Sequence, residues 1–445
     1  MKKRILHLLC LLVCFALFTG CSEVAVNPQT AIKAPGAVGI YRGVQDALEQ
    51  AVGKNIVLKY PLVGNTNTAF APCDFEGDGV QEMLAFYQLP AEGAVTRVNL
   101  IRYIDGDWHS VQDIEPAGSD IVNVEFCDLN NDGMIELCLG WNIYTNRNNQ
   151  MCIYQMDNGM FIQRAAEAYT KHIICDIDQD KVPELGLALL DTAVNSSNIT
   201  FYELNQNEWG VLGALLLDRG VSSYAKITAG GVGFQGMGVY LDAYKGADST
   251  ITELVYYKGG QLYNPFASSV DASNIATLRY CKLTSTDVND DGTLEIPFME
   301  ALPGYEAEEE QEQSPEAVKQ TDISQHLICW RAFTGKIGDP VTMWWYNPAG
   351  GYYLEIDGGW QGEFTVLYHA DRKEYAFYGW NGQAVTDRIF SIRSFTAEDW
   401  DARNQSEYTQ IYTDGTTVWA VSMVTDNGAG VTFEMVKNSF HLILQ

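Results

Sequence analysis

A nine-residue acidic segment recurs four times in this 445-residue chain, each time between two strand-like runs of apolar residues. The four copies begin at Asp74, Asp128, Asp176 and Asp287. Each copy carries oxygen-bearing side chains at positions 1, 3, 5 and 9, and three of the four carry glycine at position 6. This repeat constrains the fold more than composition does, because every copy requires a sharp turn between two strands.

These residue types at this spacing are typical of a calcium loop. Calcium takes about six to eight oxygen ligands, and the side chains at positions 1, 3, 5 and 9 converge with the carbonyl at position 7 if the chain turns sharply. We therefore expect Ca²⁺ as a cofactor. The predicted ligands, with a main-chain carbonyl as the fourth of each set, are Asp74, Glu76, Asp78, Val80 and Glu82; Asp128, Asn130, Asp132, Met134 and Glu136; Asp176, Asp178, Asp180, Val182 and Glu184; and Asp287, Asn289, Asp291, Thr293 and Glu295.

Two copies depart from the pattern. Lys181 replaces glycine at position 6 of the third copy, where it adds backbone strain and a positive charge, so the sequence leaves open whether that loop binds metal. The long side chain of Glu76 makes the first copy less regular. A helical EF-hand loop is excluded, because apolar residues stand at position 12, where such a loop needs a bidentate glutamate: Ala85, Leu139, Leu187 and Phe298. A solvated acidic turn without metal remains the alternative for any single copy.

The spacing of the copies predicts the size of the repeating unit. The first three copies begin 54 and 48 residues apart, and the fourth follows after 111 residues, or two periods. A unit without the loop is therefore expected at residues Ala225 to Phe266. Four strands are predicted in the second unit, at Ile121–Cys127, Ile135–Asn142, Gln150–Gln155 and Met160–Ala165. Four short antiparallel strands at a period near 50 predict an all-β fold, a β-propeller of four-stranded blades.

On these acidic loops, residues 67 to 300 resemble the FG-GAP/VCBS repeat family, whose calcium blades also occur in integrin α-chain propellers. The resemblance implies a propeller used mainly for binding or structure, with calcium in loops near its rim. We expect the propeller to span residues 51–346. Residues 347–445 are rich in aromatics and form either further blades or a small α+β module, ending in a helix at Thr432 to Leu444. An acidic insertion at Glu306 to Glu316 separates strands of the last expected blade.

The N-terminus predicts export and lipidation. A basic start, Lys2-Lys3-Arg4, precedes an apolar run from Ile5 to Phe18, and the sequence Leu17-Phe18-Thr19-Gly20-Cys21 resembles a bacterial lipobox. We expect a signal peptide at residues 1–20, acyl chains such as palmitate on Cys21, and a tether at residues 21–50 on the extracytoplasmic face of the cell membrane. An ordinary secretory signal is the alternative. Seven further cysteines show no metal-site spacing and are expected to be buried core residues.

The function predicted from these features is binding rather than catalysis. No sequence motif of a hydrolase, a nucleotide site or a zinc enzyme is present, and we predict no catalytic residues. The net charge of −29 excludes a nucleic-acid partner. We expect a lipid-anchored surface module that binds an extracellular protein or glycan. The alternative is a carbohydrate-binding or polysaccharide-degrading lipoprotein, for which the aromatic residues around Trp344 and Tyr353 would supply stacking surfaces.

Overall fold

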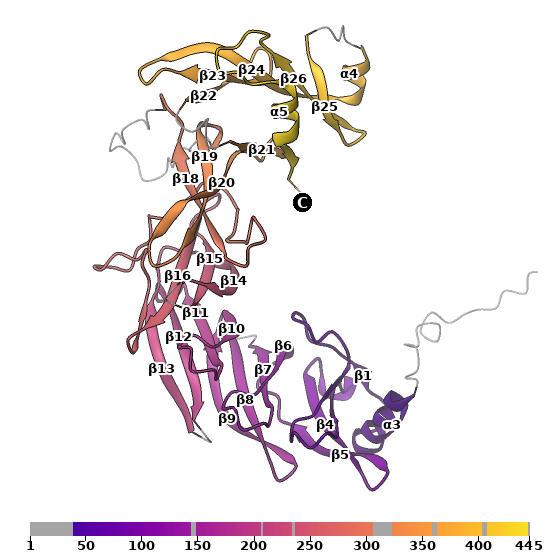
Figure 1. The fold of residues 1–445 in the computed structure, drawn as a ribbon. Helices are drawn as coiled ribbons and strands as arrows, with labels where there is room; N and C mark the ends of the chain where they lie inside the picture. The colour runs from indigo at the N-terminus through magenta and orange to yellow at the C-terminus, as the bar shows by residue number, and fades with distance from the viewer. Residues whose placement is uncertain are drawn as a thin grey trace, which may run out of the picture.

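The computed structural model describes residues 39–143, 148–205, 208–233, 236–305, 323–357, 363–402 and 407–443. The expected signal peptide, Cys21 and the acidic insertion lie outside the described residues. Six antiparallel sheets, which we call A to F, follow one another along the chain (Figure 1). An all-β fold of antiparallel sheets, several of them four-stranded, is thereby confirmed. Within the described ranges, no helix is long and apolar enough to cross a bilayer.

Sheet A is built from the first strands of the chain, with β1 and β2 both pairing with β3. Its elements are β1 (Val57–Leu58), β2 (Phe70–Cys73), β3 (Glu82–Gln88), the 3-10 turn η1 (Pro90–Glu92), β4 (Thr96–Ile104) and β5 (Asp107–Ile114). Sheet B contains β6 (Asp120–Cys127), β7 (Glu136–Asn142), β8 (Asn149–Asp157) and β9 (Met160–Tyr169). These four strands agree with those predicted for the second unit to within four residues at either end.

Sheets C and D are also four-stranded meanders. Sheet C contains β10 (Lys171–Cys175), β11 (Glu184–Asp191), β12 (Ser196–Asn205) and β13 (Glu208–Leu216). Sheet D contains β14 (Ser223–Gly231), β15 (Met237–Tyr244), β16 (Thr250–Lys258) and β17 (Gln261–Tyr263). Sheet D is the unit without an acidic loop that the spacing predicted between Ala225 and Phe266.

Sheets E and F have five strands each. Sheet E contains β18 (Glu295–Ala301), β19 (His326–Phe333), β20 (Ile337–Asn347), β21 (Tyr352–Ile356) and β27 (Phe440–Leu442), with the 3-10 turn η3 (Ile323–Gln325) before β19. Sheet F contains β22 (Phe364–His369), β23 (Glu374–Trp380), β24 (Val385–Thr396), β25 (Thr409–Thr413) and β26 (Thr417–Met423), with helix α4 (Ala397–Ala402) after β24. Because β20 pairs with β21, the expected boundary after residue 346 falls inside one sheet.

The end of the chain differs from the expected helix at Thr432 to Leu444. Helix α5 covers only Phe433–Ser439, and the next three residues form β27 at the edge of sheet E. The ring of Phe440 stacks on that of Tyr352 with centroids 5.1 Å apart, and Phe440 is buried. This contact favours the extended backbone, because it places the aromatic ring in the core between sheets E and F.

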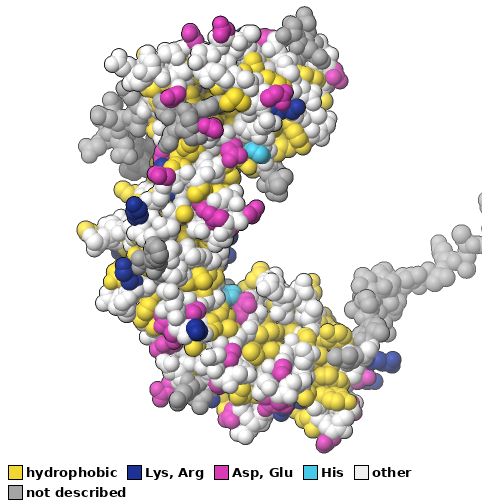
Figure 2. All heavy atoms as spheres, viewed as in Figure 1, with side chains coloured by type: hydrophobic (Ala, Val, Ile, Leu, Met, Phe, Trp, Pro, Cys, Tyr) yellow, Lys and Arg dark blue, Asp and Glu magenta, His cyan; other side chains and the backbone are white. Residues whose placement is uncertain are grey.

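The apolar cores lie between consecutive sheets. Successive residues of a strand point to opposite faces of its sheet, and therefore toward the sheets on either side. Leu84 and Phe86 of sheet A pack with Leu137 and Leu139 of sheet B, and similar apolar layers join B to C, C to D and E to F. The sheets form an open arc with A and F at its two ends (Figure 1), and the space-filling view shows the same open outline (Figure 2). Within the described residues, no strand of sheet A pairs with a strand of sheet F.

Helix α3 (Ile40–Val52) covers the free face of sheet A (Figure 1). Its residues Val44, Ala47 and Leu48 recur with helical spacing and pack against Met83 and Tyr87, on the face of β3 that points away from sheet B. The expected tether at residues 21–50 is therefore wrong for its last eleven residues. These residues form part of the folded domain because the helix buries apolar surface that sheet A would otherwise expose.

Candidate functional site: four acidic loops

Each acidic segment links strands at the same place in its sheet. Loop 1 (74–82) connects β2 to β3 in sheet A, and loop 2 (128–136) and loop 3 (176–184) connect the first two strands of sheets B and C. Loop 4 (287–295) leads into β18, and Thr286 forms an isolated antiparallel bridge with Glu295. Loops 1 and 2 touch, since Ile135 donates its N–H to the Phe75 carbonyl at 3.0 Å. The loops are therefore structurally equivalent, as the sequence pattern predicts.

Two hydrogen bonds recur in all four loops. The carboxylate at position 1 accepts the N–H of position 6, and the carboxylate at position 5 accepts the N–H of position 7. The first bond measures 2.8 Å at Gly79, 3.0 Å at Gly133, 3.0 Å at Lys181 and 2.7 Å at Gly292. The second measures 2.8 Å at each of Val80, Met134, Val182 and Thr293. These bonds curl each loop around its own carboxylates.

The glutamate at position 9 ties each loop to the protein core. Glu82, Glu136, Glu184 and Glu295 are only 2, 0, 3 and 0% exposed. One oxygen of each accepts the N–H of position 2, at 3.0 Å from Phe75, 2.7 Å from Leu129, 2.9 Å from Ile177 and 3.0 Å from Val288. The side chains of Phe75, Leu129 and Ile177 belong to the cores between sheets A and B, B and C, and C and D. The loops are thus positioned to control how neighbouring sheets pack.

The backbone adopts a left-handed conformation twice in each loop. Position 6 has φ values of 84°, 88°, 79° and 86°, and position 4 has values of 68°, 55°, 69° and 57°. The strain expected at Lys181 is present, since its φ is 79°. The left-handed conformation at position 4 is not predicted from the sequence. The residues there share only small or polar side chains, which tolerate positive φ: Gly77, Asn131, Gln179 and Asp290.

Loop 3 brings its carboxylates closest together. One oxygen each from Asp176, Asp178 and Glu184 lie within 4.8 Å of one another, and in the described part of the chain this is the one group of three potential metal ligands. The Oδ1 atom of Asp176 is buried and has no hydrogen-bond partner among the described residues. Lys181 is exposed. The loop that the sequence leaves open therefore has the most convergent ligand set.

Burial changes how readily these carboxyl groups ionise. Burial, with added repulsion from neighbouring aspartates, raises the pKa of Glu136 and of Glu184 to about 7. The pKa of Glu295 is also raised, mainly by burial, and its Oε1 atom has no hydrogen-bond partner within the described chain. A cation held among these oxygens offsets both the burial and the repulsion. The donor set, which consists of oxygens alone, fits a hard cation such as calcium.

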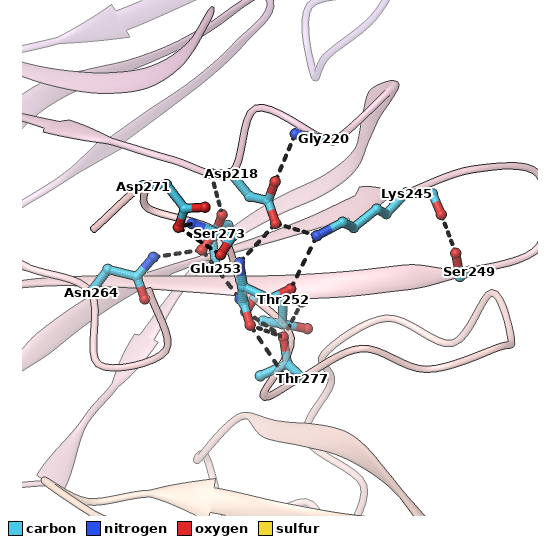
Figure 3. Close-up of polar contacts among 11 residues, drawn as sticks. Asp218, Gly220, Lys245, Ser249, Thr252, Glu253, Asn264, Asp271, Ser273 and Thr277 are labelled. Atoms are coloured by element: carbon cyan, nitrogen blue, oxygen red, sulfur yellow. Dashed lines mark hydrogen bonds and ion pairs between the residues drawn. The ribbon is translucent and has the colours of Figure 1, made fainter. Parts of the chain in front are cut away.

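Sheet D replaces the acidic loop with a buried polar network (Figure 3). Lys245 donates to Asp218 at 2.5 Å, and the buried Glu253 accepts the N–H of Asp218 at 2.7 Å and the amide of Asn264 at 2.5 Å. Asn274 also donates its N–H to Asp218 at 2.8 Å. These bonds hold the long connection after β17 against sheet D, so this unit is ordered by its own side chains.

The cysteines and aromatic residues are mostly structural. All seven described cysteines are free thiols; Cys73 and Cys127 are half-buried and the other five are buried. Trp345 and Tyr352 belong to the core between sheets E and F, whereas Trp344 and Tyr353 stack on each other at 4.1 Å and remain partly exposed.

A shallow depression of about 700 Å³ beside loop 1 is lined by Asp74, Gly79, Val80, Gln81, Met83, Tyr103 and Trp108.

Comparisons with known proteins identify no family for this chain. No family model matches the chain, and no curated protein matches it. Among solved structures it is similar to an exotype rhamnogalacturonan lyase, YesX, with 12% identity, a TM-score of 0.29, and coverage of 68% of this chain and 64% of that protein, somewhat under two thirds. It is also similar to the Bacillus licheniformis rhamnogalacturonan lyase PL11, with 12% identity, a TM-score of 0.29, and coverage of 77% of this chain and 82% of that protein. At these scores the likenesses support no statement about fold or function.

Proposed function

We propose that this protein is a calcium-binding scaffold of propeller-type blades, anchored by a lipid on Cys21 to the extracytoplasmic face of the cell membrane. In this proposal it presents its surface to an extracellular protein or glycan. The observation that carries the calcium assignment is the convergence of Asp176, Asp178 and Glu184, together with a buried Oδ1 atom of Asp176 that has no hydrogen-bond partner among the described residues. A buried acceptor of this kind is costly unless a ligand satisfies it.

Calcium has a structural part in this scheme. In loop 3, one oxygen of Glu184 already accepts the N–H of the core residue Ile177, which leaves the other for the ion. The ion therefore links a surface loop to the packing between two sheets, and ligand binding becomes folding free energy. Binding by the partner then takes place on a surface whose shape the loops maintain.

Replacing Glu184 by glutamine should remove one bound calcium ion per molecule. Glutamine keeps one oxygen, so its NH2 group must replace either the oxygen that accepts the Ile177 N–H or the oxygen left for the ion, and the negative charge is lost. The measurement is elemental analysis of calcium after dialysis against a buffer of fixed free calcium. The control is Glu208→Gln, which removes an exposed carboxylate at the start of β13 in the same sheet. Wild-type protein without calcium, or Glu184→Gln with an unchanged content, would refute the assignment.

Carbohydrate binding is a second candidate, favoured by the depression beside loop 1. The rings of Tyr103 and Trp108 lie 5.2 Å apart on its wall, with Tyr103 50% exposed, and Gln81 adds a polar group. Such a surface allows a sugar ring to stack on an aromatic face. On a glycan array, Tyr103→Ala should lose any signal of the wild type while Tyr263→Ala keeps it, since Tyr263 lies on sheet D. An array without wild-type signal argues against this candidate.

A further inference from the structure

In sheets A, B, C and E, one residue on the neighbouring strand (β4, β8, β12 or β19) faces the position 9 glutamate across the strand pair. In sheet A, the pairing of Met83 with Ile101 continues by one residue to place Arg102 opposite Glu82. In sheet B, the pairing of Leu137 with Tyr154 places Gln155 opposite Glu136. The same step places Glu203 opposite Glu184 in sheet C, and Ala332 pairs directly with Glu295 in sheet E. The four residues carry different charges, although the loops beside them are equivalent.

Arg102 lies within the ligand set of loop 1. Its Nη2 atom forms an ion pair with Glu76, and its Nε atom lies 3.6 Å from Oε1 of Glu82. These are the position 3 and position 9 ligands. Gly159, in a turn of sheet B, lies against the guanidinium, and a side chain at this position would require Arg102 to move. The guanidinium therefore lies between loop 1 and the next sheet.

The other three loops have no such cation. Gln155 donates a neutral amide hydrogen to Glu136 at 3.3 Å. Ala332 has no polar group in its side chain, and Oε1 of Glu295 has no partner within the described chain. Glu203 adds a carboxylate beside loop 3, because the register of β11 and β12 places it opposite Glu184. The asparagines at position 3 of loops 2 and 4 stay within their own loops, donating to Asp132 at 2.9 Å and to Asp291 at 3.0 Å.

We infer that this cross-strand position decides which loops bind calcium, with the guanidinium of Arg102 serving as the built-in cation of loop 1. The inference rests on the proposed calcium function and assigns its stoichiometry. Loop 1 binds no calcium, because a divalent cation there would approach a fixed positive charge and would have to displace two ion pairs. Loops 2, 3 and 4 bind one ion each. Loop 3 binds most tightly, because Glu203 adds negative charge beside its ligands. From the sequence, Lys181 makes loop 3 the most doubtful calcium site, whereas this inference makes it the tightest.

The test is the number of calcium ions bound at saturation, measured by equilibrium dialysis and by isothermal titration calorimetry. The wild type should bind three ions. Arg102→Gln, which copies the arrangement of sheet B, should bind four, and Gln155→Arg, which copies sheet A, should bind two. Arg97→Gln is the matched control: it removes an arginine from the same strand, where Arg97 pairs with Asp113 and Glu92 away from the loop, and should still bind three. Glu203→Gln should weaken the tightest site by about tenfold while the count stays at three.

The outcomes separate this inference from the proposed function. Wild-type protein that binds no calcium overturns both. Wild-type protein that binds four ions, or an unchanged count in both Arg102→Gln and Gln155→Arg, overturns the inference alone and leaves the calcium function standing. Circular dichroism in the presence of chelator establishes that each variant is folded. If Arg102→Gln fails to fold, the loss of one ion in Gln155→Arg decides the question.

Discussion

Removal of calcium should lower the thermal midpoint of this protein by about 10 °C or more. A ligand present at 100 times its dissociation constant contributes about 2.7 kcal/mol to stability, so three filled loops contribute about 8 kcal/mol. A change of this size shifts the midpoint of a large domain by about ten degrees or more. The measurement is a melting curve, followed by circular dichroism, in millimolar calcium and after addition of EDTA.

The structure indicates where this loss of stability arises. In loops 1 to 3, the position 9 glutamate accepts the N–H of a residue whose side chain packs between two sheets, as Glu136 does for Leu129 and Glu184 for Ile177. Without the ion, repulsion within the loop acts on these contacts directly. Magnesium is the control cation, because it prefers a tight octahedral site with several waters and should restore little of the lost stability. An identical midpoint in calcium and in EDTA would contradict a structural role for calcium.

Replacing Arg279 by methionine should destabilise the protein by about 3 to 5 kcal/mol, even with calcium present. Arg279 and Asp242 are 0% and 1% exposed and form an ion pair at 2.9 Å. The guanidinium also donates to the carbonyls of Leu283 at 2.8 Å and Thr277 at 3.1 Å. The substitution leaves a buried carboxylate without its counter-charge and two carbonyls without a donor. Urea unfolding, followed by tryptophan fluorescence in saturating calcium, measures the effect.

Two further variants test whether the loss of the buried ion pair causes the destabilisation. Arg219→Met removes an exposed arginine from the connection between sheets C and D and should change stability by less than about 0.5 kcal/mol. The double variant Arg279→Met with Asp242→Asn should recover part of the loss, because asparagine removes the unpaired charge and can still accept a hydrogen bond from Ser285, whose N–H lies 2.9 Å from Asp242. If Arg279→Met unfolds at the same urea concentration as the wild type, the buried pair has no role in holding the connection after β17.

Much of the secondary structure followed from local patterns. The strands of sheet B and the loop-free sheet D were predicted closely, because alternation of apolar residues and hairpin turns such as Asp157-Asn158-Gly159 act over a few residues. The two ends of the folded chain were not predicted correctly from local patterns. The sequence predicts a tether where most of α3 lies, and a helix that continues through β27. In both cases the outcome depends on a sheet distant in sequence, since α3 covers β3 and β27 pairs with β21.

The sequence by itself determined the four acidic loops, because the hydrogen bonds that join position 1 to 6, position 5 to 7 and position 9 to 2 all close within nine residues, wherever the loop lies in the fold. Tertiary structure alone decided what faces each loop. Arg102 stands 20 residues beyond Glu82 and Glu203 stands 19 beyond Glu184, and only the register of the paired strands brings them together. The electric field at a metal site sums over every nearby charge, including those that neighbouring strands supply. In the proposed scheme, the motif supplies the ligands, whereas the sheet around it controls whether calcium or the arginine side chain lies among them.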